Sequence, residues 1–315
     1  MQEVFNPLVS IIMNCLNGEK FLKRAINSIY EQTYSNWEVI FIDNGSSDSS
    51  RIIAESYDNK IKIFSLEDTI ELGEARNIAI NKTRGDFIAF LDVDDEWLPT
   101  KLMFQINLFN NQDIGIVFCN TIIRENNNSS NLFNIMKPCS GEIKCKLLEN
   151  NFITTSSLMY RKSDLLKLPF IFRGDFLLLV DYDLSIRVAG VCLADYVDKP
   201  LAIVYKHQDN ASSSNKYKYL KESKIFIKYL YDKKNKFIEN CSESVSRFMS
   251  RHNSHLAEIE FESGNILKAK KFLLSSNKMS IQNIFMYVLL TILPSYKIYS
   301  FLKLFFKKFF RLFKR

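Results

Sequence analysis

Short apolar runs alternate with segments of helical periodicity through about the first 120 residues, and this alternation limits the fold more than any other feature. The apolar runs suit buried strands and cover residues 8–13, 37–42, 61–64, 87–91 and 114–118. Between them, apolar residues recur with helical spacing, as in residues 19–32 and 71–82. Strands that alternate with helices predict an α/β fold with a mostly parallel sheet and helices on both faces. Ligands of such sheets bind beyond the carboxyl ends of the strands.

The apolar run 87–91 is followed directly by an acidic tetrapeptide, Asp92-Val93-Asp94-Asp95. Three carboxylates within four residues repel one another strongly unless a cation lies among them. Oxygen-rich clusters favour hard cations such as Mg²⁺ or Mn²⁺, which clamp diphosphates and neutralise departing charge. The alternative is a solvated acidic turn that caps the next helix, but the position after a buried strand favours a metal site.

Two further polar residues precede this cluster. Asp43 ends the second expected strand, where a carboxylate can accept a hydrogen bond from the imide N–H of a uracil ring. Its alternative role is to cap the following helix, for which Asp48 is better placed. Arg76 lies in a helix that opens near residue 73, and an arginine beside a helix N-terminus can bind a phosphate. Without the neighbouring motifs, Arg76 would be interpreted as a surface residue.

The later part of the chain offers candidates for a general base and a further ligand. Asp181 and Asp183 begin an expected helix, 181–189, and such a carboxylate can deprotonate a sugar hydroxyl. Helix N-capping is the alternative role for these carboxylates. His207, one of three histidines, follows an apolar strand and is a candidate metal ligand or diphosphate contact. A lone histidine is more often structural, so the sequence leaves this role open.

Taken together, the motifs resemble those of family 2 inverting glycosyltransferases, which have the GT-A fold, a Rossmann-like α/β domain. The resemblance covers residues 8–207, and the combination of motifs is specific although each motif alone is not. The matching segments are Val9-Ser10-Ile11-Ile12, Asn17-Gly18, Gln32-Thr33-Tyr34, Trp37-Glu38-Val39-Ile40, Asp43-Asn44-Gly45-Ser46-Ser47-Asp48, Ala75-Arg76-Asn77, Gly85-Asp86-Phe87, Phe90-Leu91-Asp92-Val93-Asp94-Asp95 and Asp181-Tyr182-Asp183-Leu184.

The resemblance implies a role for each acidic residue. Asp43 would hold the nucleobase, Asp92 the ribose and metal region, and Asp94 the divalent cation. Asp181 would be the catalytic base. The chain departs from the family pattern at two positions, because Asn44 replaces a frequent aspartate and Val180 replaces a frequent acidic residue before the base. The second departure weakens the choice between Asp181 and Asp183, of which Asp181 is preferred.

These features predict a metal-dependent, hexosyltransferase-type enzyme that uses Mn²⁺ or Mg²⁺. It would move a sugar from a nucleotide-diphosphate donor, expected to be a UDP-sugar, to a hydroxyl of a glycan or lipid-linked acceptor in bacterial surface polysaccharide synthesis. A sugar nucleotidyltransferase is one alternative, but residues 14–19 lack the Gly-rich basic loop that it would need. A catalytically silent, membrane-anchored glycan-binding or scaffold protein is the other, and the intact acidic motifs argue against it.

The charge is unevenly distributed along the chain. Residues 1–262 hold 31 basic and 35 acidic side chains, a net charge of −4. Residues 263–315 hold 11 basic residues and no acidic residue. On a helix, residues 297–315 place their basic side chains opposite a face of phenylalanine and leucine, which suits the membrane interface. Each basic residue near an anionic surface contributes about 1 kcal/mol. The unbroken apolar face argues against a nucleic-acid-binding arm, and a helix that docks on a partner protein is the other alternative.

Three parts are therefore expected: a GT-A catalytic domain, 1–215, an all-helical extension, 216–280, and a basic amphipathic membrane-associating tail, 281–315. The Asn/Ser-rich segment 125–134 is expected to be a mobile loop. No secretion signal is visible, and no apolar stretch reaches the roughly 18–20 residues of a spanning helix. None of the six cysteines forms a CxxC pair typical of zinc sites. The expected location is cytoplasmic and peripheral on the inner face of the cell membrane, with no nucleic-acid partner.

Overall fold

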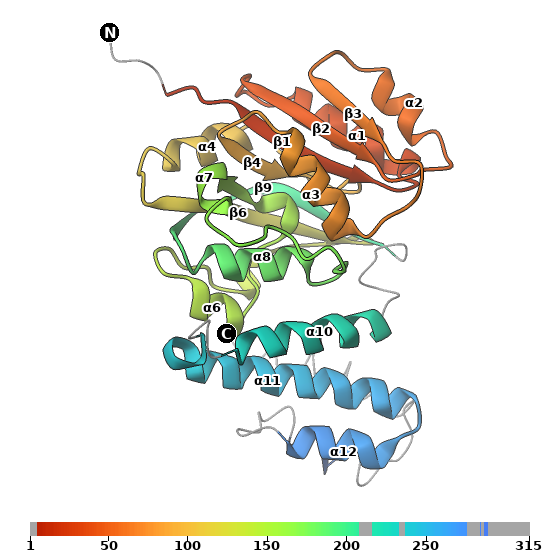
Figure 1. Ribbon diagram of the computed structural model, residues 1–315, viewed down its shortest axis with the longest axis vertical. Helices are drawn as coiled ribbons and strands as arrows, with labels where there is room; N and C mark the ends of the chain where they lie inside the picture. Colours follow the sequence, from red (N-terminus) through yellow and green to blue (C-terminus); the bar gives the residue numbers. More distant parts are fainter. Residues whose placement is uncertain (1–4, 208–215, 233–236, 276–283, 285–286, 289–315) are drawn as a thin grey trace. The chain divides into compact units, whose positions relative to one another are not determined.

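The computed structural model of the chain describes residues 5–207, 216–232 and 237–275, together with residues 284, 287 and 288 (Figure 1). The chain divides into two compact units, Met1–Phe226 and Ile227–Arg315. The expected division into catalytic domain, extension and tail stays a prediction. Almost all of the tail, 281–315, lies outside the described residues.

A single sheet runs through the first unit, and its strands follow the order β3-β2-β1-β4-β8-β6-β9-β5, with β7 paired to β6. The half with the first strands is parallel and contains β1 (Val9–Cys15), β2 (Trp37–Asp43), β3 (Ile61–Ser65) and β4 (Phe87–Phe90). The other half is mixed and contains β8 (Met159–Arg161), β6 (Ile114–Glu125), β9 (Leu193–Lys206) and β5 (Glu96–Trp97). The expected α/β sheet is confirmed, and its antiparallel pairs begin where β8 runs against β4.

Helices cover both faces of this sheet, as expected (Figure 1). On one face lie α1 (Glu19–Tyr30) and α4 (Lys101–Leu108), whose buried residues join the apolar side chains of β1 in one core. On the other face lie α3 (Leu72–Lys82) and α8 (Val180–Val188). The short α2 (Ser50–Glu55) packs against β2 and β3.

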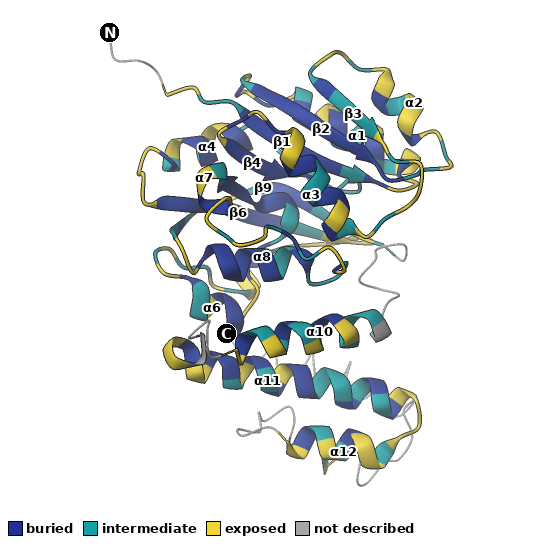
Figure 2. Cartoon of the chain, viewed as in Figure 1, coloured by how far each residue is buried: buried dark blue, intermediate teal, exposed yellow. Residues whose placement is uncertain are grey.

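The period of two in β1 explains why that strand forms where it does. Val9, Ile11 and Met13 alternate along the strand, are all completely buried and pack with Leu22 and Ile26 of α1. Burial of each such side chain contributes about 1.5–3 kcal/mol, so α1 is held mainly by this core. The central strands are buried throughout, whereas the outward helix faces are exposed (Figure 2).

The register of the parallel strands brings the ends of β2 and β4 to the same edge of the sheet. Cys15 pairs with Asp43 at the end of β2, and Ile12 pairs with Phe90 at the end of β4. The acidic residues that follow β4 therefore lie at the edge where Asp43 ends β2. This arrangement is the one predicted from the alternation of strands and helices.

One expectation was wrong, because residues 125–134 are not an irregular loop. They continue β6 into a hairpin with β7 (Asn128–Asn131), in which Glu125 pairs with Asn128. The left-handed conformation of Asn126, with φ of 54°, allows the two-residue turn. The connections that follow contain α5 (Leu132–Ile135), α6 (Lys144–Glu149), the 3-10 turn η1 (Thr155–Ser157) and α7 (Lys162–Leu165).

From residue 216 onward, the regular elements in the described ranges are all helices, as predicted for the extension. Its helices are α10 (Lys216–Leu230), which crosses the boundary between the units, α11 (Phe237–Glu262) and α12 (Ile266–Leu274). Gly264, with φ of 81°, makes the turn between α11 and α12. Within the described ranges, every helix is too short or too polar to cross a membrane.

Candidate active site

Asp43 is held in a tight turn at the end of β2. Only 4% of the residue is exposed, and its Oδ1 accepts a hydrogen bond from the backbone N–H of Ser46 at 3.1 Å. The side chain of the neighbouring Asn44 donates to the carbonyl of Ile70 at 2.8 Å and accepts from its N–H at 3.0 Å. Asn44 therefore fixes the loop between β3 and α3, a task for which its amide is better suited than the aspartate frequent in the family.

Asp48 supplies the hydrogen bond expected of a cap, from the position before Ser49, the N-cap residue of α2. Its carboxylate accepts from the backbone N–H of Ser50 at the start of α2 and from that of Glu19 at the start of α1, both at 2.9 Å. One carboxylate thus satisfies a donor at the beginning of two helices. This leaves Asp43 without a capping duty for α2, in agreement with the sequence interpretation.

The three carboxylates after β4 point in different directions. Asp95 is 4% exposed, and its carboxylate accepts from the Ser156 hydroxyl at 2.5 Å and from the Tyr205 N–H at 3.3 Å. Burial, followed by the nearby Asp92 and Asp94 carboxylates, raises the pKa of Asp95 well above its ordinary value. The hydrogen bonds of the buried Asp95 therefore stabilise the turn. The Asp92 and Asp94 side chains, in contrast, remain 42% and 22% exposed.

Asp94 and His207 converge although 113 residues separate them. Nε2 of His207 lies 3.1 Å from Oδ2 of Asp94, and the imidazole stacks on the ring of Phe21 with centroids 4.8 Å apart. Arg24 of α1 donates to the backbone carbonyl of Asp94 at 2.6 Å and lies over the ring of Tyr205 at 3.8 Å. The end of β9 and the acidic turn are thereby joined through α1. No local signal in the sequence pointed to Arg24.

Arg76 lies between Asp92 and Asp181. Its guanidinium donates to Oδ1 of Asp92 at 3.0 Å and to Oδ1 of Asp181, and only 2% of its side chain is exposed. Burial lowers the pKa of Arg76, but the carboxylates of Asp181 and Asp92 raise it by more, so the pKa lies above its ordinary value. The structure thus places Arg76 beneath the two carboxylates, and a contact with a donor phosphate stays a prediction.

The structure places Asp181 and Asp183 in different environments. Oδ2 of Asp181 accepts from the Thr155 hydroxyl at 2.9 Å, and its side chain remains 22% exposed. Asp183 is completely buried and forms ion pairs with Arg187 at 2.7 Å and Arg173 at 3.2 Å. Asp181 therefore faces Asp92 across Arg76, whereas Asp183 is enclosed by two guanidinium groups.

Glu222 of α10 holds the segment that leads into α8, and the sequence reasoning missed it. Its buried carboxylate accepts from three consecutive backbone N–H groups, those of Leu177, Leu178 and Leu179, at 2.8–2.9 Å. This is the negative charge that a helix N-terminus favours. The structure thus brings a carboxylate from a distant helix to the backbone directly before Val180.

Glu222→Ala is expected to destabilise the fold by about 2–4 kcal/mol, because three buried N–H donors lose a charged acceptor. Thermal unfolding followed by circular dichroism measures this loss. Glu222→Gln keeps one acceptor oxygen and is expected to lose less. An unchanged melting temperature in Glu222→Ala would show that the three hydrogen bonds do not hold this segment.

The donor set suits the divalent cation implied by the resemblance. Carboxylate oxygens and one imidazole nitrogen are ligands that Mn²⁺ accepts, and Asp94 and His207 bring one of each together. In the part of the chain that the structure describes, no three Asp, Glu, His or Cys side chains form a metal cage. Phosphates and water would complete the coordination, as is usual for Mg²⁺ in nucleotide sites. The residues present therefore fit such an ion.

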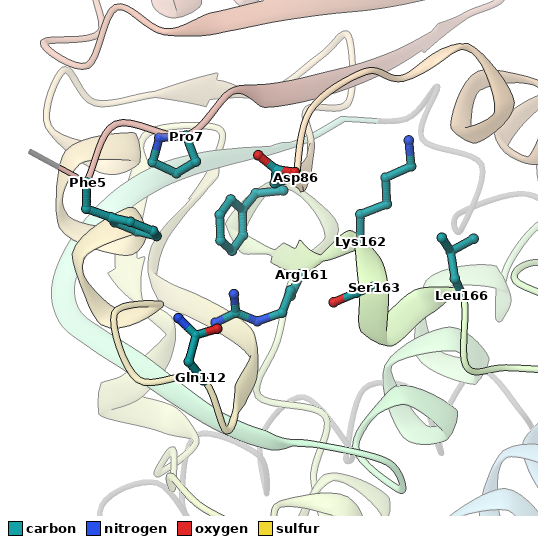
Figure 3. A pocket seen from close by; sticks show the side chains of 9 residues that line it. Phe5, Pro7, Asp86, Gln112, Arg161, Lys162, Ser163 and Leu166 are labelled. Atoms are coloured by element: carbon teal, nitrogen blue, oxygen red, sulfur yellow. The ribbon is translucent and has the colours of Figure 1, made fainter. Parts of the chain in front are cut away.

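A cavity of about 480 Å³ lies at the opposite end of the strands (Figure 3). Its lining includes Asp86 and Phe87 at the beginning of β4, together with Arg161 and Lys162. Asp92 lies five residues beyond Phe87, which corresponds to roughly 16 Å along an extended chain. The cavity is therefore separate from the acidic edge.

Comparison with known proteins places this geometry in a family. Residues 10–168 match the family described as Glycosyl transferase family 2. The chain belongs to this family. Its similarity to a UDP-Glc:α-D-GlcNAc-diphosphoundecaprenol β-1,3-glucosyltransferase of Escherichia coli, WfgD, is 31% identity over 236 residues, which cover 74% of this chain and 87% of that protein. It is 32% identical over 117 residues to a putative teichuronic acid biosynthesis glycosyltransferase of Bacillus subtilis, TuaG, across 36% of this chain and 46% of that protein.

Solved structures confirm the GT-A fold of this family 2 member. The structure of S. aureus TarS 1–349 in complex with UDP-GlcNAc superposes with a TM-score of 0.66 at 19% identity, covering 85% of this chain and 81% of that one. The mannosyltransferase PcManGT from Pyrobaculum calidifontis, in complex with GDP-Man and Mn²⁺, gives a TM-score of 0.63 at 16% identity, covering 94% and 82%. At these identities the likeness concerns the fold. The family and the fold class expected from the sequence are therefore confirmed.

Proposed function

We propose that this glycosyltransferase transfers a sugar with inversion from a nucleotide-diphosphate donor, a UDP-sugar, to a hydroxyl of a lipid-linked or glycan acceptor. The observation that carries the proposal is the arrangement of Asp92 and Asp181 around Arg76, beside Asp94 and His207. An aspartate opposite the donor-side carboxylates suits direct displacement, in which one base and no covalent enzyme intermediate are needed. The E. coli relative WfgD, named for a UDP-glucose donor and a diphosphoundecaprenol-linked acceptor, supports the donor and acceptor classes.

Each residue has a distinct task in this mechanism. Asp181 accepts the proton of the acceptor hydroxyl, whose oxygen attacks the anomeric carbon from the face opposite the diphosphate. Asp43, buried at the end of β2, accepts a hydrogen bond from the nucleobase. The positive charge of Arg76 offsets the repulsion between the Asp92 and Asp181 carboxylates, and its hydrogen bonds hold both side chains in place.

Asp94 and His207, with Asp92 beside them, would hold Mn²⁺ or Mg²⁺, which when bound stabilises the negative charge of the departing nucleoside diphosphate. The Arg24 hydrogen bond to the Asp94 carbonyl and the stacking of His207 on Phe21 fix the orientation of both ligands. Preorganised ligands lose little entropy when the donor binds, which favours the charge stabilisation on which transfer depends.

The experiment that tests this function incubates the full chain with Mn²⁺ and a panel of UDP-, GDP- and dTDP-sugars and follows nucleoside diphosphate release. Release from one UDP-sugar, increased by a polyprenyl-diphosphate-linked sugar, is the expected result. Formation of inorganic pyrophosphate from a sugar phosphate and a nucleoside triphosphate would indicate a nucleotidyltransferase instead. Binding of glycans without any release would indicate a silent glycan-binding protein.

We further propose that the chain associates with an anionic membrane surface through residues 281–315, on the inner face of the cell membrane. The basic, phenylalanine-rich pattern of these residues supports this. On the described helix α12, Leu267 and Leu274 are 84% and 57% exposed, and the exposed Lys271 shares their face of the helix. Exposed leucines beside lysines suit the same surface.

Flotation with liposomes is expected to carry the full chain upward with vesicles that contain anionic phospholipid and to leave it behind with purely zwitterionic vesicles. The reason is that attraction of several basic residues adds to burial of the apolar face. A chain ending at residue 280 is expected to stay at the bottom of the gradient. Equal flotation of both chains, or none for either, would contradict a membrane role for the tail.

A further inference from the structure

The 3-10 turn η1 reaches both sides of the candidate active site. Thr155 and Ser156 are adjacent in sequence, yet the Thr155 hydroxyl contacts Asp181 at the start of α8, and the Ser156 hydroxyl contacts the turn after β4. Neither residue stands out in the sequence, because Thr-Ser-Ser is common in loops. Only the fold brings the two hydroxyls to the acidic edge.

Ser156 ties together the two ends of the acidic turn. Its completely buried hydroxyl donates to Oδ2 of Asp95 at 2.5 Å and accepts from the backbone N–H of Asp92 at 3.2 Å. The N–H of Asp95 also donates to the Asp92 carbonyl at 3.0 Å. These three hydrogen bonds close the loop from which the Asp94 side chain projects. The direction of that side chain therefore depends on a hydroxyl outside the acidic motif.

Thr155 completes the set of partners that orient Asp181. The carboxylate accepts from Arg76 on Oδ1 and from the Thr155 hydroxyl on Oδ2, at 2.9 Å. Donors from different elements that bind both oxygens of a carboxylate restrict its orientation. The same arginine contacts Asp92, so the position of Asp181 relative to the acidic turn is set by two routes, one through Arg76 and one through η1.

The turn itself is rigidly supported by the surrounding elements. The Ser156 carbonyl accepts from the indole N–H of Trp97 at 2.7 Å, and the Ser157 carbonyl accepts from the Gln105 amide at 2.7 Å. Lys101, completely buried and 4.0 Å from the Trp97 ring centre, donates to Oε1 of Gln105 at 2.6 Å. These anchors come from β5 and α4, so η1 cannot shift without disturbing the core.

We propose that η1 is a positioning element that sets the base on α8 against the cation-binding turn after β4, with Thr155 acting on Asp181 and Ser156 acting on the Asp92–Asp95 turn. The proposal rests on the function proposed above. Its physical basis is that displacement of a catalytic group by about 1 Å can lower a rate by about a hundredfold. It makes two neighbouring hydroxyls responsible for different measured quantities, kcat for Thr155 and Mn²⁺ affinity for Ser156.

Thr155→Val keeps the shape of the side chain and removes the donor to Asp181. We expect kcat to fall by about 10–100-fold with the KM for the donor within twofold of wild type, because the base loses its second anchor and the donor site is untouched. Thr155→Ser restores the hydroxyl and is expected to restore most of kcat. Thr33→Val is the matched control, because it removes an exposed hydroxyl that donates to the Pro99 carbonyl at 3.2 Å.

Ser156→Ala is expected to act on the cation instead. Loss of an outer partner of a metal-binding turn weakens metal affinity by about 10–100-fold. The Mn²⁺ affinity is measured by electron paramagnetic resonance in the presence of UDP, a measurement that requires no turnover. We expect the Mn²⁺ affinity to fall in Ser156→Ala and to stay within twofold of wild type in Thr155→Val. Thermal unfolding of each variant shows whether a change in kcat or in Mn²⁺ affinity results only from loss of the folded state.

Three results would overturn the proposal: wild-type kcat in Thr155→Val, failure of Thr155→Ser to recover activity, or equal Mn²⁺ affinity in Ser156→Ala and wild type. Failure of the proposed function is recognised separately, since the wild-type chain would then release no nucleoside diphosphate from any donor. In that case the proposal is tested by crystal structures of wild type and Thr155→Val. An Asp181 carboxylate in the same position in both would show that η1 does not position it.

Discussion

Replacing Asp181 with asparagine is expected to lower kcat by about 10²–10⁴-fold while the affinity for UDP and Mn²⁺ changes little, because an amide has the same shape but cannot accept the acceptor's proton. The side chain can keep both contacts, since the amide oxygen can accept from Arg76 while the amide NH₂ donates to the Thr155 hydroxyl. The measurements are steady-state release of nucleoside diphosphate and calorimetric titration with UDP. A variant that retains wild-type kcat would remove Asp181 from the mechanism.

Asp183→Asn is the matched comparison, two residues away on the same helix. Its carboxylate is completely buried between Arg173 and Arg187, so its loss leaves two guanidinium groups without their shared partner. Breaking a buried ion pair in this way costs about 3–5 kcal/mol. We therefore expect a large fall in melting temperature and, in the fraction that stays folded, near-normal kcat. The opposite pattern, with a stable but inactive Asp183→Asn and an active Asp181→Asn, would reverse the assignment of the base.

Asp94→Ala is expected to lower transfer at saturating donor by at least about 10²-fold, because it removes a charged ligand that the proposed cation cannot replace with water at equal strength. Addition of Mn²⁺ to high concentration is expected to recover only a small part of the activity. His207→Ala removes a neutral ligand, and we expect mainly a rise of about tenfold in the Mn²⁺ concentration needed for half-maximal rate. Nucleoside diphosphate release as a function of Mn²⁺ measures both effects.

Asp113→Ala serves as the control for loss of one acidic side chain. Asp113 is exposed, and it directly precedes β6, away from the acidic edge. It is expected to match the wild type in rate and in Mn²⁺ dependence. Metal-dependent turnover of Asp94→Ala equal to that of Asp113→Ala would rule out Asp94 as a cation ligand.

The sequence predicted the fold well in the segments where buried apolar side chains form a clear pattern. In β1 and α1 the apolar side chains recur at spacings of two and of three to four residues, so the element type follows from the side chains themselves. The segment 125–134 defeated this reasoning, because an exposed hairpin has no buried face to produce a pattern. Its strand β7 is stabilised by backbone hydrogen bonds to β6 and by the turn at Asn126, neither of which requires apolar residues.

The sequence predicted the position of acidic groups at the ends of strands, and the roles of these groups stay predictions. Asp43 and Asp92 were placed at one edge because parallel strands end together. Partners drawn from distant segments were missed, among them Arg24, Thr155 and Glu222. Each of these acts through hydrogen bonds to groups that are 26–70 residues away in the chain. No local pattern encodes such a contact, since any polar residue on an exposed face looks the same in sequence.

By itself, the sequence determined the alternation of strands and helices, the acidic edge and the family to which the chain belongs, because these depend on local periodicity and on short motifs in a particular order. The tertiary structure alone decided which of two aspartates is enclosed by arginines and which faces the site. It also decided that Arg76 lies beneath Asp92 and Asp181. The reason is physical: burial and charge pairing arise only when segments far apart in the chain pack together, and they decide whether a carboxylate stabilises the fold or is accessible to a substrate.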